Sequence, residues 1–183
     1  MIIRLLLLAL PVLAWLSGIT ATAAELTEFR GNAETPPLVL DDMHGRPHTL
    51  ADYRGNVVLV NFWAGWCFPC VQEIPQMLRL AESLAEQPFI ILAVNVGEEK
   101  RRLPGFVKSM DKFMVILMDT DSTAFKEWKG IGLPSTFVVD TTGQIRYEAY
   151  GAVNWDRADI VAGIKALIDE PTVKTAALQT SQQ

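Results

Sequence analysis

Three apolar segments rich in β-branched residues constrain the fold of this chain more than any other feature of its sequence. They cover 56–64, 89–96 and 113–118, and each is almost entirely apolar. A strand buried on both faces has this continuous pattern, whereas a half-exposed strand alternates polar with apolar residues. Stretches with turn residues and helical periodicity separate the three segments, most clearly over 71–87. This order predicts an α/β fold with a central sheet between helices.

The flanking segments extend this pattern at both ends. Two strand-like stretches at 135–140 and 145–151 enclose the turn Thr-Thr-Gly-Gln and predict an antiparallel hairpin. A short helix is expected over 122–130, with Ser122 as its cap and Gly130 as its stop, and the last helix over 155–169. Residues 38–49 predict a further hairpin. We therefore expect a mixed β-sheet flanked by helices, with an N-terminal β-hairpin extension and a βα insertion.

Residues 1–24 have the composition of a secretory signal peptide. Arg4 precedes an apolar stretch over 5–16, and Ala21-Thr22-Ala23 matches the small-residue pattern of a cleavage site. The alternative is an uncleaved membrane anchor, because 5–24 is about as long as a membrane span. Either way we expect export to the periplasm, where disulfides persist.

The chain of 183 residues is expected to hold one domain. Residues 25–36 are polar and predict a spacer, 37–170 form the domain, and 171–183 predict a disordered tail. The net charge is −5 and no cluster of basic residues occurs, which argues against a nucleic-acid partner.

The only two cysteines, Cys67 and Cys70, follow the first apolar segment and begin the strongest helical pattern. At a helix N-terminus, unpaired backbone N–H groups and the helix dipole stabilise a thiolate and lower the thiol pKa. We therefore expect Cys67 to be the exposed, attacking thiolate. Cys70 lies one turn further on and is expected to be the shielded, resolving thiol. Pro69 is tolerated in a first helical turn, where its missing N–H is not needed.

Two other uses of the cysteine pair remain open. A structural disulfide that closes so short a loop restricts the unfolded chain little. A metal site needs more than two ligands, and the only histidines, His44 and His48, lie upstream of the pair. Redox chemistry is the favoured interpretation, and no metal is expected.

Two stretches carry a resemblance to a known family. The segment VVLVNFWAGWCFPCVQEIP, together with GLPSTFVVD downstream, resembles the exported thioredoxin-like reductases of the TlpA/ResA/CcmG type. The resemblance covers about 37–169 and implies a thioredoxin-like fold and thiol–disulfide exchange without a bound cofactor. It also implies that Pro134 is a cis-proline packed against the cysteines, and that Glu73 handles the proton of the buried thiol. Spacing alone favours an exposed Glu73 and a trans Pro134. Asn61 stands where typical thioredoxins carry a buried aspartate.

The residues around the pair suggest a docking groove for a substrate. Trp66 is expected to be a partly exposed platform beside Cys67, with Phe68, Pro69 and Leu133 completing the groove. The other aromatic and charged residues that stand out are assigned to packing or to a solvated face: Trp63, Trp128, Trp155 and 98–102.

The resemblance implies reduction of specific exported proteins that contain disulfides, such as apo-cytochrome c, with electrons from a membrane thiol carrier. An oxidase or isomerase on the same fold is the alternative, although Phe68-Pro69 carries no positive charge to stabilise a thiolate strongly. A copper-binding assembly protein needs C-x-x-x-C and a distant histidine, which this chain lacks. A peroxidase needs threonine or serine where Ala64 stands.

Overall fold

The computed structural model describes residues 23–31 and 34–170. The predicted signal peptide lies outside the described residues except for its last two positions, and the predicted tail lies outside them altogether. The helices and strands, in chain order, are β1 (Thr27–Glu28), β2 (Val39–Asp41), β3 (Pro47–Thr49), a 3₁₀ turn (Leu50–Tyr53), β4 (Val57–Trp63), α1 (Phe68–Ser83), β5 (Phe89–Val96), a second 3₁₀ turn (Lys100–Arg102), α2 (Val107–Met110), β6 (Val115–Asp119), α3 (Thr123–Glu127), β7 (Ser135–Val139), β8 (Ile145–Tyr150) and α4 (Ala158–Asp169).

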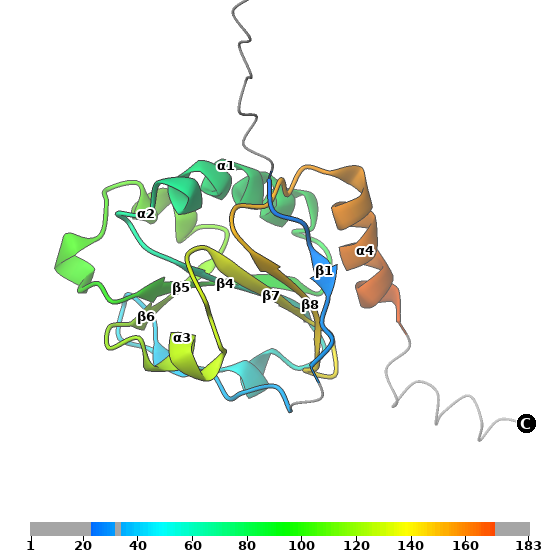
Figure 1. Cartoon of the computed structure of the whole chain (residues 1–183), viewed down its shortest axis with the longest axis horizontal. Coiled ribbons are helices and arrows are strands. Elements are labelled where there is room, and N and C mark those ends of the chain that lie inside the picture. The colour runs from blue at the N-terminus through cyan, green and yellow to red at the C-terminus, as the bar shows by residue number, and fades with distance from the viewer. Residues whose placement is uncertain (1–22, 32–33, 171–183) are drawn as a thin grey trace, which may run out of the picture.

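A six-stranded mixed sheet with the order β1-β8-β7-β4-β5-β6 forms the centre of the molecule (Figure 1). The three apolar segments become the neighbouring strands β4, β5 and β6, which run parallel to one another. β7 runs antiparallel to both β4 and β8. The predicted α/β fold, its mixed sheet and its late hairpin are therefore confirmed.

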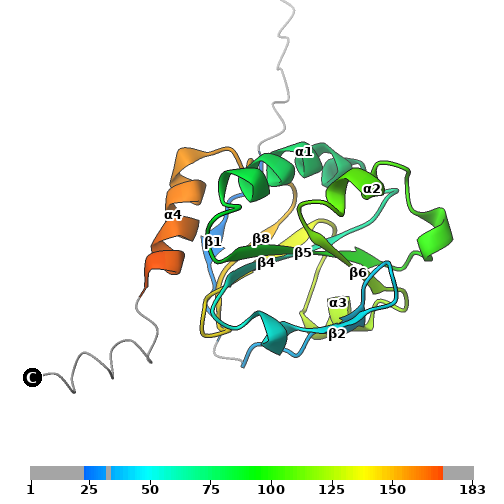
Figure 2. The same ribbon diagram turned by 180° about the vertical axis from the view of Figure 1, so that it is seen from behind.

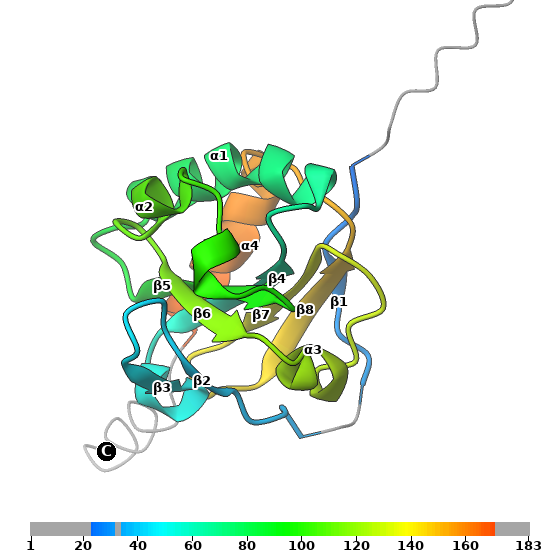
Figure 3. The same cartoon turned by 90° about the vertical axis from the view of Figure 1, so that its left-hand side faces the viewer.

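Both faces of the sheet are buried, and successive side chains of a strand enter different cores. In β4, Val57, Leu59 and Trp63 belong to one core, which also contains residues of α1, α2 and α4. Val58 and Val60 enter the second core, which contains Trp128 and residues of α3. Figure 3 shows α1, α2 and α4 on one side of the sheet and α3 with the β2–β3 hairpin on the other. Helices on both sides explain why the strand sequences are apolar without alternation.

The N-terminal hairpin predicted over 38–49 is present as β2 and β3, which pair antiparallel. It lies beside the edge strand β6, where the backbone N–H of Met43 donates to the carbonyl of Ile116 over 2.9 Å (Figure 2). The hairpin therefore covers one edge of the large sheet. An uncovered edge strand would leave its backbone N–H and C=O groups free to pair with other chains.

The segment expected as a spacer over 25–36 contributes a strand. In β1, Thr27 and Glu28 pair antiparallel with Glu148 and Tyr147 of β8. The N–H of Ala24 also donates to the carbonyl of Ala152 over 2.7 Å. This stretch is polar and short, but the free backbone groups of the β8 edge give it partners. It therefore runs along the sheet rather than away from it (Figure 1).

The cap of α3 differs from the expectation. Ser122 occupies the cap position with a φ of 61°, but its side chain makes no capping hydrogen bond. The carboxylate of Asp119, at the end of β6, instead accepts from the backbone N–H groups of Ala124 and Phe125 over 3.1 and 2.8 Å. A buried carboxylate thus supplies the acceptors that the first turn requires.

Over the described ranges, no helix combines the length and the apolar character of a membrane span.

Candidate active site

The candidate site lies at one end of the sheet, where four strands bring their loops together. The parallel strands β4 and β5 both end there, since Trp63 pairs with Asn95. β7 begins at the same end, because Ser135 pairs with Phe62 and with Tyr150 at the end of β8. The cysteine motif, the residues before β7 and the β8–α4 loop therefore meet at this edge. Ligand sites of open α/β sheets commonly lie at the carboxyl ends of the parallel strands.

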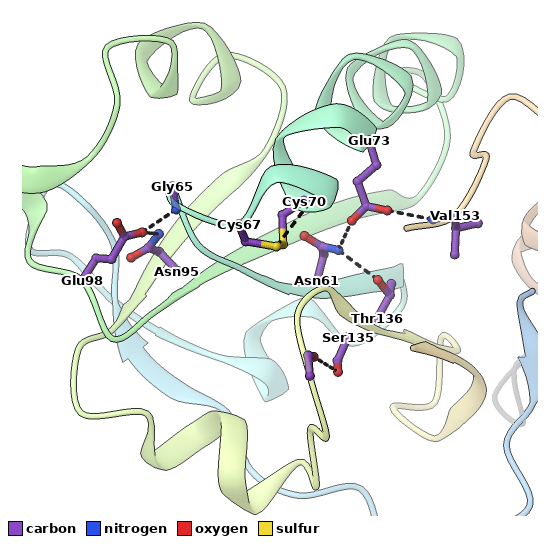
Figure 4. The surroundings of a disulfide bond; sticks show 11 residues. Asn61, Gly65, Cys67, Cys70, Glu73, Asn95, Glu98, Ser135, Thr136 and Val153 are labelled. Carbon is purple, nitrogen blue, oxygen red and sulfur yellow. Dashed lines mark hydrogen bonds between the residues drawn. A yellow bond between two sulfur atoms is a disulfide. The ribbon is translucent and has the colours of Figure 1, made fainter. Parts of the chain in front are cut away.

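Cys67 and Cys70 are joined in a disulfide at the start of α1 (Figure 4), and their Cα atoms lie 5.3 Å apart. Cys67 is the N-cap of the helix, and its Sγ accepts from the backbone N–H of Cys70 over 3.4 Å. Pro69 lies within the first turn. The helix N-terminus therefore directs a backbone donor at the Cys67 sulfur, as the sequence predicts, and this donor favours a negative charge there.

The exposure of the cysteines differs from the expectation. Cys70 is fully buried, and Cys67 is only 5% exposed, although it was expected to be exposed. The difference arises because the Cys67 sulfur is turned inward, toward Cys70. The neighbours of Cys67 are open to solvent instead: Trp66 and Phe68 are each 71% exposed. Trp66 thus lies exposed as predicted, and Trp66 and Phe68 form an apolar rim beside a nearly buried disulfide.

The residues before β7 form the other side of the site. The Leu133–Pro134 peptide is cis, as the resemblance implies and spacing alone does not. Pro134 is buried and Leu133 is half-buried. The hydroxyl of Ser135 donates to the carbonyl of Gly132 over 2.6 Å and closes this turn. Ile131, three residues before Pro134 and not predicted as part of the site, is an apolar side chain that is 78% exposed.

Glu73 is a buried carboxyl group, only 2% exposed, and not the exposed helix residue that its spacing alone would suggest. It projects from the same face of α1 as Cys70 (Figure 4). Its Oε1 accepts from Asn61 Nδ2 over 2.9 Å. Its Oε2 accepts from the backbone N–H of Val153 over 3.0 Å and from the indole Nε1 of Trp155 over 3.2 Å. Both carboxyl oxygens are therefore fixed by donors from distant parts of the chain.

Burial raises the pKa of Glu73 to about 7, even though the three hydrogen bonds act in the opposite direction. Desolvation disfavours the charged form of a carboxyl group, while donors directed at its oxygens favour that form. A group with such a pKa exchanges its proton readily near neutral pH. The site thus holds a buried carboxyl group whose pKa lies near neutral pH, on the same helix face as Cys70.

Asn61 connects Glu73 to the neighbouring strand. Its Nδ2 also donates to the hydroxyl of Thr136 on β7 over 2.9 Å, and Asn61 itself is buried. The amide therefore occupies the space between β4, β7 and α1 without adding a charge. Burying a neutral amide with its hydrogen bonds made costs far less than burying a carboxylate.

Glu98 also belongs to the site, although the sequence analysis assigned it to a solvated face. Its Oε2 accepts from the backbone N–H of Gly65 over 2.5 Å and from Asn95 Nδ2 over 2.8 Å. Gly65 stands two residues before Cys67, so Glu98 fastens the cysteine loop to the end of β5 (Figure 4). The run of charges over 98–102 concealed this contact. Whether a carboxylate in such a run is merely solvated or binds a backbone N–H depends on the tertiary structure around it.

Trp155 was assigned to packing, and it is indeed fully buried. Its hydrogen bond to Glu73 joins residues 82 positions apart. No sequence signal indicates this contact, because it depends on how α4 and its preceding loop fold back on α1.

Within residues 23–31 and 34–170, no three His, Cys, Asp or Glu side chains are grouped so that they could hold a metal ion.

Comparison with known proteins gives a consistent result. A sequence profile of the AhpC/TSA family matches residues 32–148. The thiol-disulfide oxidoreductase ResA of Geobacillus thermodenitrificans is 38% identical over 123 residues, which are 67% of this chain and 70% of that protein. ResA of Bacillus subtilis is 34% identical over 113 residues, or 62% of this chain and 63% of its own length.

Solved structures share the fold. A putative thiol:disulfide interchange protein DsbE from Chlorobium tepidum matches with a TM-score of 0.64 and 24% identity, over 74% of this chain and 95% of that one. A secreted thiol-disulfide isomerase from Corynebacterium glutamicum matches with a TM-score of 0.66 and 19% identity, over 80% and 99% of the two chains. At these identities the likeness shows the thioredoxin-like fold alone.

Proposed function

Because this chain belongs to the AhpC/TSA family, and within it to the ResA-type thiol-disulfide oxidoreductases, we propose that it reduces specific disulfides of exported proteins. The observation that carries the proposal is a buried Glu73 beside a cysteine pair at a helix N-terminus. A thiol reductase needs a nucleophilic thiolate at one cysteine and a proton acceptor for the other, and these residues are suited to both tasks.

The reaction begins with the dithiol form of the protein. The Cys67 thiolate, stabilised by the α1 N-terminus, attacks one sulfur of the substrate disulfide. A mixed disulfide forms between Cys67 and the substrate, and the second substrate sulfur leaves as a thiolate that takes up a proton. Trp66, Phe68 and Leu133 supply an apolar surface on which the substrate chain docks, with Pro69 at its margin.

The second step returns the pair to the disulfide. Glu73 accepts the proton of the Cys70 thiol, and the resulting thiolate attacks Sγ of Cys67. The bond between Cys67 and the substrate breaks, and the other substrate sulfur leaves and is protonated. Two electrons have then passed from the dithiol to the substrate. Pro134 borders the pair during both steps.

The substrate and the electron source follow from the proposed location. The N-terminal residues support export to the periplasm, where protein disulfides form and where a reductase has substrates. The substrate is an exported protein with a disulfide, and apo-cytochrome c fits this class. A membrane protein with a thiol pair returns electrons to Cys67 and Cys70.

The reduction potential of the pair tests the direction of the reaction. We expect a value more negative than about −180 mV, in the range of reductases and weak oxidants. Equilibration of the purified protein with defined thiol buffers gives this number. A potential near about −120 mV, the value of a strong oxidant, would overturn the reductase proposal in favour of the oxidase alternative.

Trapping tests the division of labour and names the substrate. In Cys70→Ser, attack by Cys67 is possible but no thiol resolves the product, so covalent adducts with exported proteins should accumulate. Cys67→Ser is the matched control and should form none, because Cys70 is fully buried. Non-reducing gels of the exported fraction give the result. Equal adducts with both variants, or adducts with neither, would contradict the proposed roles.

A further inference from the structure

A polar stripe on α1 holds the β8–α4 loop against the site. Glu73 accepts from Val153 and Trp155. Three residues further along the helix, Gln76 Oε1 accepts from the backbone N–H of Trp155 over 3.0 Å. Another three residues on, Arg79 donates to Asp156 over 2.6 Å. Positions three apart lie on one helix face, so a single face of α1 binds three residues of the loop, Val153, Trp155 and Asp156.

Trp155 differs from the other members of this contact because its side chain reaches the reacting end of the stripe. The indole is fully buried, and its Nε1 directs its only hydrogen at Oε2 of Glu73. With Val153 also bound to Oε2, the opposite oxygen, Oε1, is left for Asn61. Figure 4 shows that side of Glu73 turned toward the cysteine pair.

We propose that Trp155 is a positioning residue for thiol–disulfide exchange: its indole N–H holds the Glu73 carboxyl in the orientation in which that group receives the proton of Cys70. The inference rests on the proposed function for its chemical meaning. Its geometric content concerns the Trp155–Glu73 contact alone and can be tested separately.

The groups that face Glu73 carry no charge. β4 presents Asn61, whose amide is also bound to the hydroxyl of Thr136 on β7. A cavity of about 660 Å³ opens against Glu73 between α1 and the β8–α4 loop, and its other polar side chains are Gln72, Gln76, Tyr150 and Asn154. The phenol of Tyr150 is the one further titratable group in that lining. Among the described residues, the indole N–H is one of three hydrogen-bond donors that offset the burial of the carboxylate.

The test is Trp155→Phe, which removes the indole N–H and keeps an aromatic ring. The backbone bond of residue 155 to Gln76, the Val153 bond to Glu73 and the Arg79–Asp156 ion pair do not involve the indole. The loop should therefore stay in place. Trp128→Phe is the matched control, because Trp128 is equally buried and its Nε1 donates over the same 3.2 Å, but to the carbonyl of Pro37.

The readout is the titration of Glu73 in the disulfide form, in which the cysteines do not ionise. Carbon-13 NMR of side-chain carboxyl groups follows it, and the signal missing from Glu73→Gln identifies the residue. Loss of one hydrogen bond to the carboxylate should raise the midpoint in Trp155→Phe by about one pH unit. Trp128→Phe should titrate like the wild type.

A midpoint in Trp155→Phe that matches the wild type would overturn the inference. The pH profile of cysteine alkylation in the reduced protein should shift in the same direction as the NMR midpoint, and an unshifted profile would equally contradict a role in proton transfer. A shifted titration in a protein that reduces no protein disulfide would leave the contact established and refute the proposed function instead.

Discussion

Replacing Glu73 by glutamine should change how the stability of the protein depends on pH. The unfolded carboxyl has a pKa of 4.5, and burial raises the folded value to about 7. Between these values the folded protein binds the proton and the unfolded chain does not, so the stability of the wild type falls as the pH rises. The contribution is fully present below pH 4.5 and is lost as the pH passes the folded value. Glutamine does not titrate and removes this loss.

The expected size follows from the same two values. A rise from 4.5 to about 7 corresponds to roughly 3 kcal/mol, at about 1.4 kcal/mol per pH unit. Glu73 is almost fully buried, so solvent screening reduces this figure little. The unfolding free energy of the wild type, measured relative to that of Glu73→Gln, should therefore fall by about 3 kcal/mol between acid and mildly alkaline pH.

Glutamine fits the site with one adjustment. Its carbonyl oxygen can accept from Val153 and Trp155 as Oε2 does now. Its amide would face Asn61 Nδ2, a second donor, unless the Asn61 side chain turns over. In the wild type the hydroxyl of Thr136 accepts from Asn61. After the turn, the Asn61 oxygen accepts from the new glutamine amide, and the Thr136 hydroxyl donates to that same oxygen. Any cost of this adjustment is an offset that does not vary with pH, so the pH dependence remains the decisive quantity.

Urea unfolding of both proteins in the disulfide form, from about pH 5 to pH 8.5, gives the measurement. Glu82→Gln, an exposed position on the same helix, controls for the loss of one negative charge from α1. If the wild type and Glu73→Gln lose stability in parallel across this range, the buried carboxyl does not titrate there. In that case its proposed role as proton acceptor loses its physical basis.

Three further changes test the rest of the site. Trp66→Ala should slow exchange with protein disulfides at least several-fold but leave exchange with a small disulfide nearly unchanged, because the exposed ring contacts only a large partner. Stopped-flow rates with the two kinds of disulfide measure this difference. Glu98→Ala should lower the unfolding free energy by about 1–2 kcal/mol in urea titrations, since it leaves the Gly65 N–H without its acceptor, and Glu98→Gln should lower it less. Asn61→Asp places a second carboxyl beside Glu73, so stability should fall more steeply above neutral pH than in the wild type.

The central strands could be predicted because the local sequence of each one is continuously apolar, which indicates burial on both faces. A segment such as 89–96, apolar almost throughout, is compatible with little except a strand covered on both faces, and β5 has the same bounds. The order of the elements then limits the sheet to few arrangements. β1 could not be predicted in this way, because its two residues are exposed and carry no apolar pattern. Its pairing depends on β8, more than a hundred residues away.

The chemistry of the site divides in a similar way. The cysteine motif and the helix that begins with it are contiguous, so local rules place Cys67 at the cap. The burial of Glu73 is produced by Val153 and Trp155, which are 80 and 82 residues distant. Spacing alone therefore predicts an exposed glutamate, and only the resemblance to a family indicated otherwise. The contact of Glu98 with Gly65 is long-range in the same sense.

The contrast between the buried disulfide and its exposed surroundings explains how such a protein can be selective. Cys67 is 5% exposed, whereas its sequence neighbours Trp66 and Phe68 are each 71% exposed. A small thiol gains almost nothing from that apolar rim and must still reach a shielded sulfur. A protein with a complementary surface buries the rim, and burial of about 100 Å² of apolar surface is worth roughly 2.5 kcal/mol. That gain lengthens the life of the encounter in which the sulfurs align. Selectivity then depends on the surface around the cysteines, while in the proposed mechanism Glu73 and the helix N-terminus supply the reactivity that any substrate would meet.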